Sequence, residues 1–114
     1  NAVFFELFDT AVNAWLSEQE LFQMDIDPMC VVARHACDYF SEVKLSDKVE
    51  VGLAIETIGT SSLTYVLALF RIGEDQPAAQ GTYVHVAVDR TTRRPTPIRP
   101  ETIRKCAKVV IATD

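Results

Sequence analysis

The sequence has 114 residues, of which 48% are hydrophobic and 24% are charged, and these values are typical of one globular domain. Its formal net charge is −5, although residues 90–114 hold seven of the eleven Lys and Arg residues. An acidic body with a basic C-terminal segment argues against a general nucleic-acid binder. It suits a small anionic ligand held near that segment, and a solvated charged face explains it equally well.

The cysteines indicate the compartment in which the protein works. Cys30, Cys37 and Cys106 are odd in number, lack metal-ligand spacing and form no CxxC motif. We therefore predict reduced thiols in a cytoplasmic protein. Since neither a signal peptide nor a transmembrane segment is recognisable, we predict no membrane partner.

Residues 1–17 predict a helix that is apolar on nearly every side. Its polar side chains recur three or four positions apart and so form one narrow stripe, consisting of Glu6, Asp9, Thr10, Asn13 and Ser17. A surface helix has a wider polar face than this. We therefore expect the rest of the chain to wrap around the helix.

Four strands are expected after a loop at residues 18–29. Alternation of apolar and polar residues, or a high content of β-branched and aromatic residues, marks them at residues 31–40, 49–56, 63–70 and 78–89. Their connections are short, which predicts antiparallel pairing. Residues 95–98 are extended by two prolines, and Pro100 opens a short helix that ends near Lys108. We predict one α+β domain over residues 1–114, with a further strand preceding it.

The order of these elements resembles the hotdog fold, in which a curled antiparallel β-sheet wraps around one long central α-helix. The segments are similar to its acyl-CoA thioesterase branch, the 4-hydroxybenzoyl-CoA thioesterase-like family. The motifs that carry this resemblance are Asn1-Ala2-Val3-Phe4-Phe5-Glu6, Cys37-Asp38-Tyr39-Phe40, Ser46-Asp47-Lys48-Val49-Glu50-Val51, Gly59-Thr60-Ser61-Ser62-Leu63-Thr64-Tyr65, and Val86-Ala87-Val88-Asp89 leading to Arg94-Pro95-Thr96-Pro97-Ile98. The resemblance implies hydrolysis of acyl-CoA to a free acid and CoA without a cofactor or metal. It also implies a dimer or tetramer with active sites shared between subunits.

The resemblance places the reaction at the start of the first helix. In this family an Asp-x-x-Gly-His-x-Asn run usually precedes the helix, and Asn1 resembles the second Asn that follows it. The catalytic Asp would then lie seven residues before Asn1, outside this sequence. The backbone N–H of Asn1 would act as the oxyanion donor, because the first N–H groups of a helix are unpaired and partially positive. The alternative is that Asn1 only caps the helix.

Two carboxylates and two serines are further candidates for the active site. Glu6 and Asp9 are the carboxylates of the first helix, where a second branch of hotdog thioesterases places its catalytic carboxylate; a salt-bridged polar stripe is the alternative. By the resemblance, Ser61 and Ser62 lie near the bound thioester, and a role in the turn explains them equally well.

A cluster of arginines is the candidate site for the nucleotide end of CoA. Arg90, Arg93 and Arg94 occupy one predicted turn, and a guanidinium group can offer two parallel donors to one phosphate. Solvent-facing charge is the alternative reading of this cluster.

Two other functions remain open from the sequence. A hotdog hydratase or dehydratase would need a histidine that faces the polar stripe of the first helix, and His35 or His85 would supply it. A structural role explains either histidine as well. The second alternative is a non-catalytic acyl-CoA-binding homologue.

Overall fold

Two helices and four strands make up the part of the chain that the computed structural model describes, which comprises residues 2–22, 28–44 and 46–108. In chain order the elements are α1 (Ala2–Glu18), β1 (Met29–Tyr39), β2 (Val49–Ile58), β3 (Ser62–Arg71), β4 (Ala79–Val88) and α2 (Pro100–Ala107). The predicted elements are therefore confirmed, with ends that differ by at most two residues.

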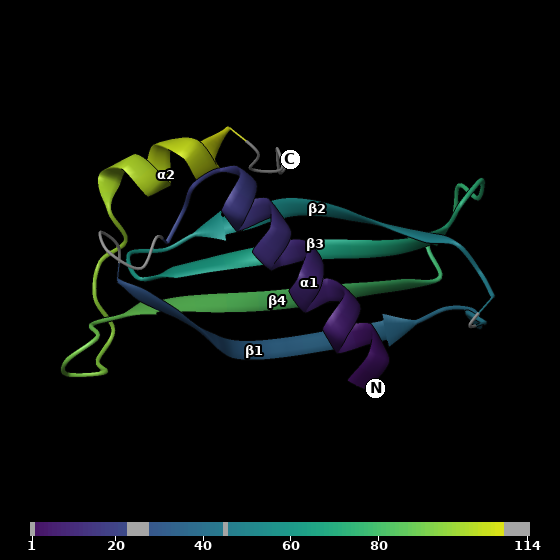
Figure 1. The fold of residues 1–114 in the computed structure, drawn as a ribbon, viewed down its shortest axis with the longest axis horizontal. Coiled ribbons are helices and arrows are strands. Elements are labelled where there is room, and N and C mark those ends of the chain that lie inside the picture. The colour runs from purple at the N-terminus through teal and green to yellow at the C-terminus, as the bar shows by residue number, and fades with distance from the viewer. Residues whose placement is uncertain (1, 23–27, 45, 109–114) are drawn as a thin grey trace.

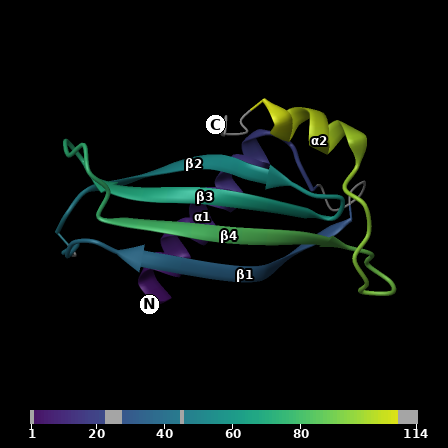
Figure 2. The same cartoon turned by 180° about the vertical axis from the view of Figure 1, so that it is seen from behind.

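The strands form one antiparallel sheet in the order β1-β4-β3-β2, so that β1 and β2 are its edges. Helix α1 crosses one face of the sheet diagonally, and α2 lies at the end of the sheet beside β2 (Figure 1). Seen from behind, the opposite face of the sheet carries no helix of the described residues (Figure 2). The predicted α+β arrangement of a curled sheet around one long helix is confirmed.

The core lies between α1 and the sheet. Phe8, Val12 and Leu16 recur four residues apart and are buried, because this spacing places them on one face of the helix. The alternating residues of β3 that face them are fully buried as well, namely Leu63, Tyr65, Leu67 and Leu69. The buried side chains, which recur with a 3.6-residue period in the helix and a two-residue period in the strand, therefore pack together in one apolar layer.

A glycine in β4 allows the helix to approach the sheet closely. A Cβ atom at Gly81 would lie 2.9 Å from Cε2 of Phe8 and 3.0 Å from the carbonyl oxygen of Ala36. Any side chain here would push either the Phe8 ring or the backbone of β1 away. Gly81 therefore sets the depth at which α1 packs.

The polar stripe of α1 is largely as predicted. Its exposed members are Glu6, Thr10, Asn13 and Ser17, whereas Asp9 is half-buried and faces the sheet. Asp9 differs from the others because a tyrosine of β4 lies beneath it, which helical spacing alone does not show. The sheet covers one side of α1.

Among the described residues, no helix has both the length and the apolar character needed to span a bilayer.

Candidate functional site

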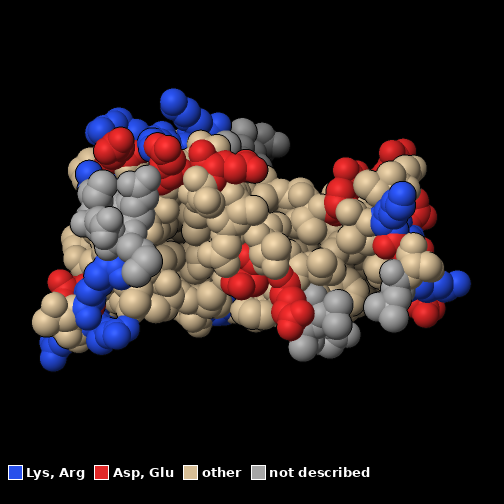
Figure 3. Space-filling view, viewed as in Figure 1, with Lys and Arg blue, Asp and Glu red and all other residues tan. Residues whose placement is uncertain are grey.

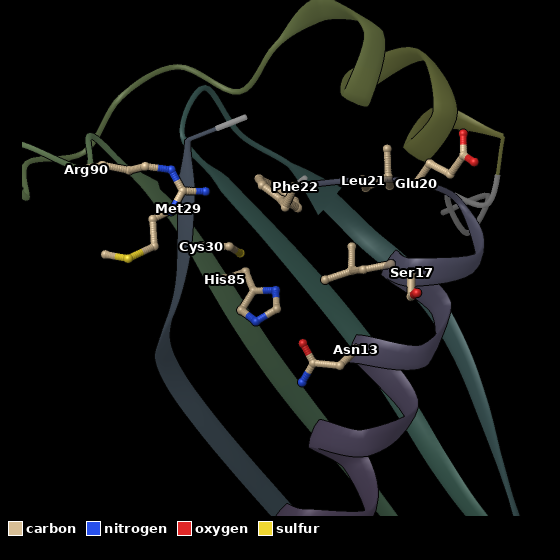
Figure 4. Close-up of a pocket in the computed structure, with 10 residues that line it drawn as sticks. Asn13, Ser17, Glu20, Leu21, Phe22, Met29, Cys30, His85 and Arg90 are labelled. Carbon is tan, nitrogen blue, oxygen red and sulfur yellow. The ribbon is translucent and has the colours of Figure 1, made fainter. Parts of the chain in front are cut away.

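A cavity of about 480 Å³ opens between the second half of α1, the start of β1 and the end of β4. Figure 4 shows side chains from these three elements projecting into one space. The lining residues are Asn13, Leu16, Ser17, Glu20, Leu21, Phe22, Met29, Cys30, His85 and Arg90. Half of these residues are polar and half are apolar, so the wall can contact both kinds of chemical group.

His85 is the buried polar group of this cavity. Its Nδ1 lies 3.1 Å from the hydroxyl of Tyr65 on the neighbouring strand, and only 5% of the His85 side chain is exposed. Burial lowers the pKa of His85 to about 4, although the nearby carboxylate of Asp9 opposes this shift. Burial also raises the pKa of the Tyr65 hydroxyl far above its usual range. At neutral pH both groups are therefore uncharged.

The lowered pKa of His85 predicts a loss of stability in mild acid. In the unfolded chain the histidine binds a proton near pH 6.5, whereas in the folded chain it binds one only near pH 4. The unfolded state therefore binds more protons in this window, and the free energy of unfolding should fall by about 3 kcal/mol from pH 6.5 to pH 4. Urea unfolding measured across this range tests the prediction.

The matched control for this titration is the double variant Tyr65→Phe/His85→Phe, which removes the histidine without leaving the tyrosine hydroxyl unpaired. It should lose clearly less stability over the same pH range than the unchanged protein. Part of the fall should remain, because burial also lowers the pKa of His35. Equal losses in both proteins would show that His85 is not the titrating group.

Asp9 and Glu6 are placed differently from each other. The hydroxyl of Tyr83 donates a hydrogen bond to Oδ1 of Asp9, while Glu6 is exposed on the outer side of α1. Burial, together with this bond to Asp9, raises the pKa of Tyr83. Neither carboxylate lines the cavity, and a catalytic role for either stays a prediction. Asn1 lies outside the described residues.

The predicted arginine cluster forms a tight turn after β4. Oδ1 of Asp89 accepts hydrogen bonds from the N–H groups of Thr91 and Thr92, both at 2.8 Å, and these bonds lower the pKa of Asp89. Arg93 has a φ of 63° within this turn, and its Nη1 lies 3.4 Å from Sδ of Met29. Figure 3 shows basic side chains gathered at this end of the molecule.

Arg90 connects the turn to the cavity. Its side chain lines the cavity, and Figure 4 shows the guanidinium group close to Met29 at the start of β1. Arg93 and Arg94 lie on the outside of the same turn and are exposed. The turn thus offers one guanidinium group to the cavity and two to the surface beside it.

Ser61 and Ser62 lie at the same end of the sheet as the arginine turn, because Ser62 pairs with Val86 near the end of β4. Both serines are half-buried, and their carbonyl groups accept hydrogen bonds from the N–H groups of Ala87 and Gly59 at 2.8 Å. Neither lines the cavity. These are backbone bonds that do not involve the hydroxyl groups, so both a role of the hydroxyls in the turn and their contact with a thioester stay predictions.

The predicted site residues fall into two groups at opposite ends of β1. The start of α1 lies against the end of β1, where the ring centroids of Phe4 and Tyr39 are 4.7 Å apart. The cavity and the arginine turn lie at the other end of the strand, where Met29 pairs with Val88 (Figure 1). Within one chain, the helix start and the arginines are therefore not brought together.

The sequence offered His85 only as a candidate of the hydratase alternative, with a structural role as the other explanation, and its place in the cavity was not predicted. The available signal was that Tyr83, His85 and Ala87 share one strand face. That signal does not identify the hydroxyl of Tyr65 as the neighbour, because the strand register is needed for this. Among residues 2–22, 28–44 and 46–108, no three His, Cys, Asp or Glu side chains gather to hold a metal ion, and hydrolysis without a metal stays a prediction.

Comparisons with known proteins place the chain among related sequences and structures. Residues 1–106 match the model of the Thioesterase-like superfamily. The crystal structure of the PA5185 protein from Pseudomonas aeruginosa strain PAO1 is similar, with a TM-score of 0.90 and 35% identity over 100% of this chain and 80% of that one. Among curated proteins, none matches significantly.

Two further structures bear on the fold and on ligands. A thioesterase from Thermus thermophilus, complexed with coenzyme A and Zn, has a TM-score of 0.80 and 28% identity over 96% of this chain and 78% of that one. A 1,4-dihydroxy-2-naphthoyl-CoA thioesterase from Synechocystis has a TM-score of 0.83 at 18% identity over 95% of this chain and 82% of that one, a likeness of fold alone. These similarities confirm the predicted hotdog fold.

Proposed function

The chain belongs to the Thioesterase-like superfamily, and we therefore propose that it hydrolyses acyl-CoA thioesters to a free acid and CoA. Membership of the superfamily supports thioester hydrolysis in general. The coenzyme A complex of the Thermus thermophilus relative supports CoA as the carrier of the acyl group. The free thiols of Cys30, Cys37 and Cys106 are compatible with the proposed location in the cytoplasm.

The observation that supports an active site shared between two copies is the separation, within one chain, of the helix start from the arginine turn. Strand β1 is an edge of the sheet, and Val31 and Val32 on it are 37% and 42% exposed. An open apolar edge favours pairing with another strand. Two copies that pair antiparallel through β1, about a two-fold axis near Arg34, would set Met29 of each copy beside Tyr39 of the other.

This pairing would complete two equivalent active sites. The start of α1 lies against Tyr39, so it would reach the cavity and arginine turn of the partner. We infer a dimer in which each site combines the helix start of one protomer with Arg90, Arg93 and Arg94 of the other. A tetramer built from two such dimers is compatible with the open rear face of the sheet (Figure 2).

The proposed reaction follows from these positions. The first N–H groups of α1, with Asn1 as the donor that the family resemblance suggests, would polarise the thioester carbonyl. Water, activated by the family's Asp before Asn1, would attack the carbonyl and break the C–S bond; alternatively, that Asp would itself attack and break the C–S bond, forming an acyl-enzyme anhydride that water then hydrolyses. The CoA thiolate then leaves and takes up a proton. The arginine turn would hold the CoA phosphates through charge-assisted hydrogen bonds.

One observation bears on the hydratase alternative. His85 faces α1 and lines the cavity, as a hydratase would require, whereas His35 lies edge-on against Phe5 and does not line it. However, the pKa of His85 is lowered to about 4, which makes its imidazole a weak base at neutral pH. This favours the hydrolase over the hydratase.

The activity is tested by incubating the full-length protein with short-chain, long-chain and aromatic acyl-CoAs. Release of free CoA thiol is the result expected of a hydrolase. Loss of enoyl absorbance without thiol release would instead identify a hydratase. Tight binding of acyl-CoA with neither reaction would identify a non-catalytic binder.

The arginine turn gives a more specific prediction. Arg90→Glu combined with Arg93→Glu should raise KM for an acyl-CoA about tenfold to a hundredfold, because hydrogen bonds to charged phosphate groups are lost. The same variant should leave KM nearly unchanged for the corresponding acyl-pantetheine, which lacks the nucleotide. Lys48→Glu is the control, since Lys48 is exposed at the opposite end of the sheet. Equal effects on both substrates would place the nucleotide elsewhere.

A further inference from the structure

We propose that Asp89 is a positioning residue for CoA, which holds the turn of Arg90, Arg93 and Arg94 in the shape that presents its guanidinium groups to the CoA phosphates. This inference rests on the proposed hydrolysis of acyl-CoA. It assigns a role in binding to a residue whose own charge has the wrong sign for contact with phosphate. The hydrogen bonds within the turn carry the inference.

Asp89 is bonded to each of the last four residues of the arginine turn. Its Oδ1 accepts hydrogen bonds from the N–H groups of Thr91 and Thr92, both at 2.8 Å. Its carbonyl oxygen accepts from the N–H group of Arg93 at 2.8 Å, and its own N–H group donates to the carbonyl oxygen of Arg94 at 2.9 Å. A single residue therefore closes the whole turn, half of it through its side chain.

The turn needs these bonds because its backbone is strained at Arg93. The φ of Arg93 is 63°, which lies in the left-handed region that a residue with a Cβ atom rarely adopts. Because Arg93 is exposed, packing contributes little to holding this conformation. Loss of the two side-chain bonds of Asp89 would therefore allow the turn to relax. Its guanidinium groups would then have to be ordered again each time CoA binds.

The charge of Asp89 acts against CoA binding. Its carboxylate is exposed, and the hydrogen bonds from Thr92 and Thr91 lower the pKa of Asp89, so the group is ionised at neutral pH. A negative charge beside the arginines repels the phosphates. Removing the side chain therefore has opposite consequences under the two explanations. Loss of the charge alone would lower KM, whereas loss of the hydrogen bonds would raise it.

The test compares Asp89→Ala with Asp89→Asn. Asp89→Ala removes both the charge and the two side-chain bonds, and we expect KM for an acyl-CoA to rise about tenfold with little change in kcat. Asp89→Asn removes the charge but keeps an oxygen that can accept from the same N–H groups. Its KM should therefore stay near that of the unchanged protein or fall below it.

Two controls separate positioning of the arginines from a general structural role. Neither variant should alter KM for the corresponding acyl-pantetheine, which lacks the nucleotide. Asp47→Ala is the matched variant, because Oδ2 of Asp47 accepts a similar bond from the N–H group of Lys44 at 2.7 Å. Asp47 precedes β2 at the opposite end of the sheet, and its replacement should leave KM for both substrates unchanged.

Calorimetric Kd values for a CoA thioether, which cannot be hydrolysed, separate the failure of this inference from the failure of the proposed function. Equal KM and Kd values in Asp89→Ala and Asp89→Asn would overturn the positioning role and leave the hydrolase intact. An equal rise in KM for acyl-CoA and acyl-pantetheine would overturn it as well. Absence of thiol release from the unchanged protein would overturn the hydrolase, and a tenfold weaker Kd in Asp89→Ala alone would still support the positioning role.

Discussion

Replacing Phe8 by alanine is expected to lower the free energy of unfolding by about 3–5 kcal/mol. The Phe8 side chain is fully buried between α1 and the sheet, and its ring touches the backbone of β4 where Gly81 leaves room for it. Truncation loses the transfer free energy of the ring and leaves a cavity that the close backbone contact keeps from collapsing. Urea denaturation monitored by circular dichroism measures the effect.

The matched control for Phe8→Ala is Phe40→Ala, since the Phe40 side chain is 58% exposed. Its truncation should change the free energy of unfolding by less than about 1 kcal/mol. If the two variants were equally stable, the packing of α1 onto β4 would differ from the one described.

Introducing a charge into the exposed edge of the sheet is expected to reduce acyl-CoA hydrolysis about a hundredfold or more at a fixed protein concentration. In the proposed dimer, Val32→Glu places two like charges near the two-fold axis and takes both out of water. An unpaired buried charge typically costs about 3 kcal/mol or more, which corresponds to a factor of at least ~100 in the association constant. Thiol release and sedimentation measured on the same samples test the prediction.

Ile72→Glu is the control for this edge, because the Ile72 side chain is also an exposed aliphatic one, at 57%, and lies beyond the end of β3. It should leave both the oligomeric state and the rate nearly unchanged. A monomeric Val32→Glu protein that hydrolyses acyl-CoA at the full rate would contradict the shared active site.

The elements of the fold were predictable because their signals are local. The four-residue spacing of Phe8, Val12 and Leu16 identifies the buried face of α1, and the two-residue alternation of Leu63 and Tyr65 identifies the buried face of β3. Short connections then require antiparallel neighbours. Each of these inferences uses residues that are close together in the sequence.

The candidate site was less predictable, because its contacts join residues that are far apart in the sequence. The bond between Tyr65 and His85 joins residues 20 positions apart, and the one between Asp9 and Tyr83 joins residues 74 positions apart. Both depend on strand register and on the angle at which α1 crosses the sheet. The turn after β4 was predictable as a basic cluster, but the position of Arg90 at the cavity depends on the hydrogen bonds of Asp89.

The proposal that each active site is built from two protomers is tested most directly by a crystal structure of the full-length protein with a non-hydrolysable acyl-CoA thioether. The account predicts the sulfur atom beside the start of α1 of one protomer. It places the CoA phosphates on the turn of Arg90, Arg93 and Arg94 of the other protomer. A ligand held entirely within one protomer, or bound away from both helix starts, would contradict it.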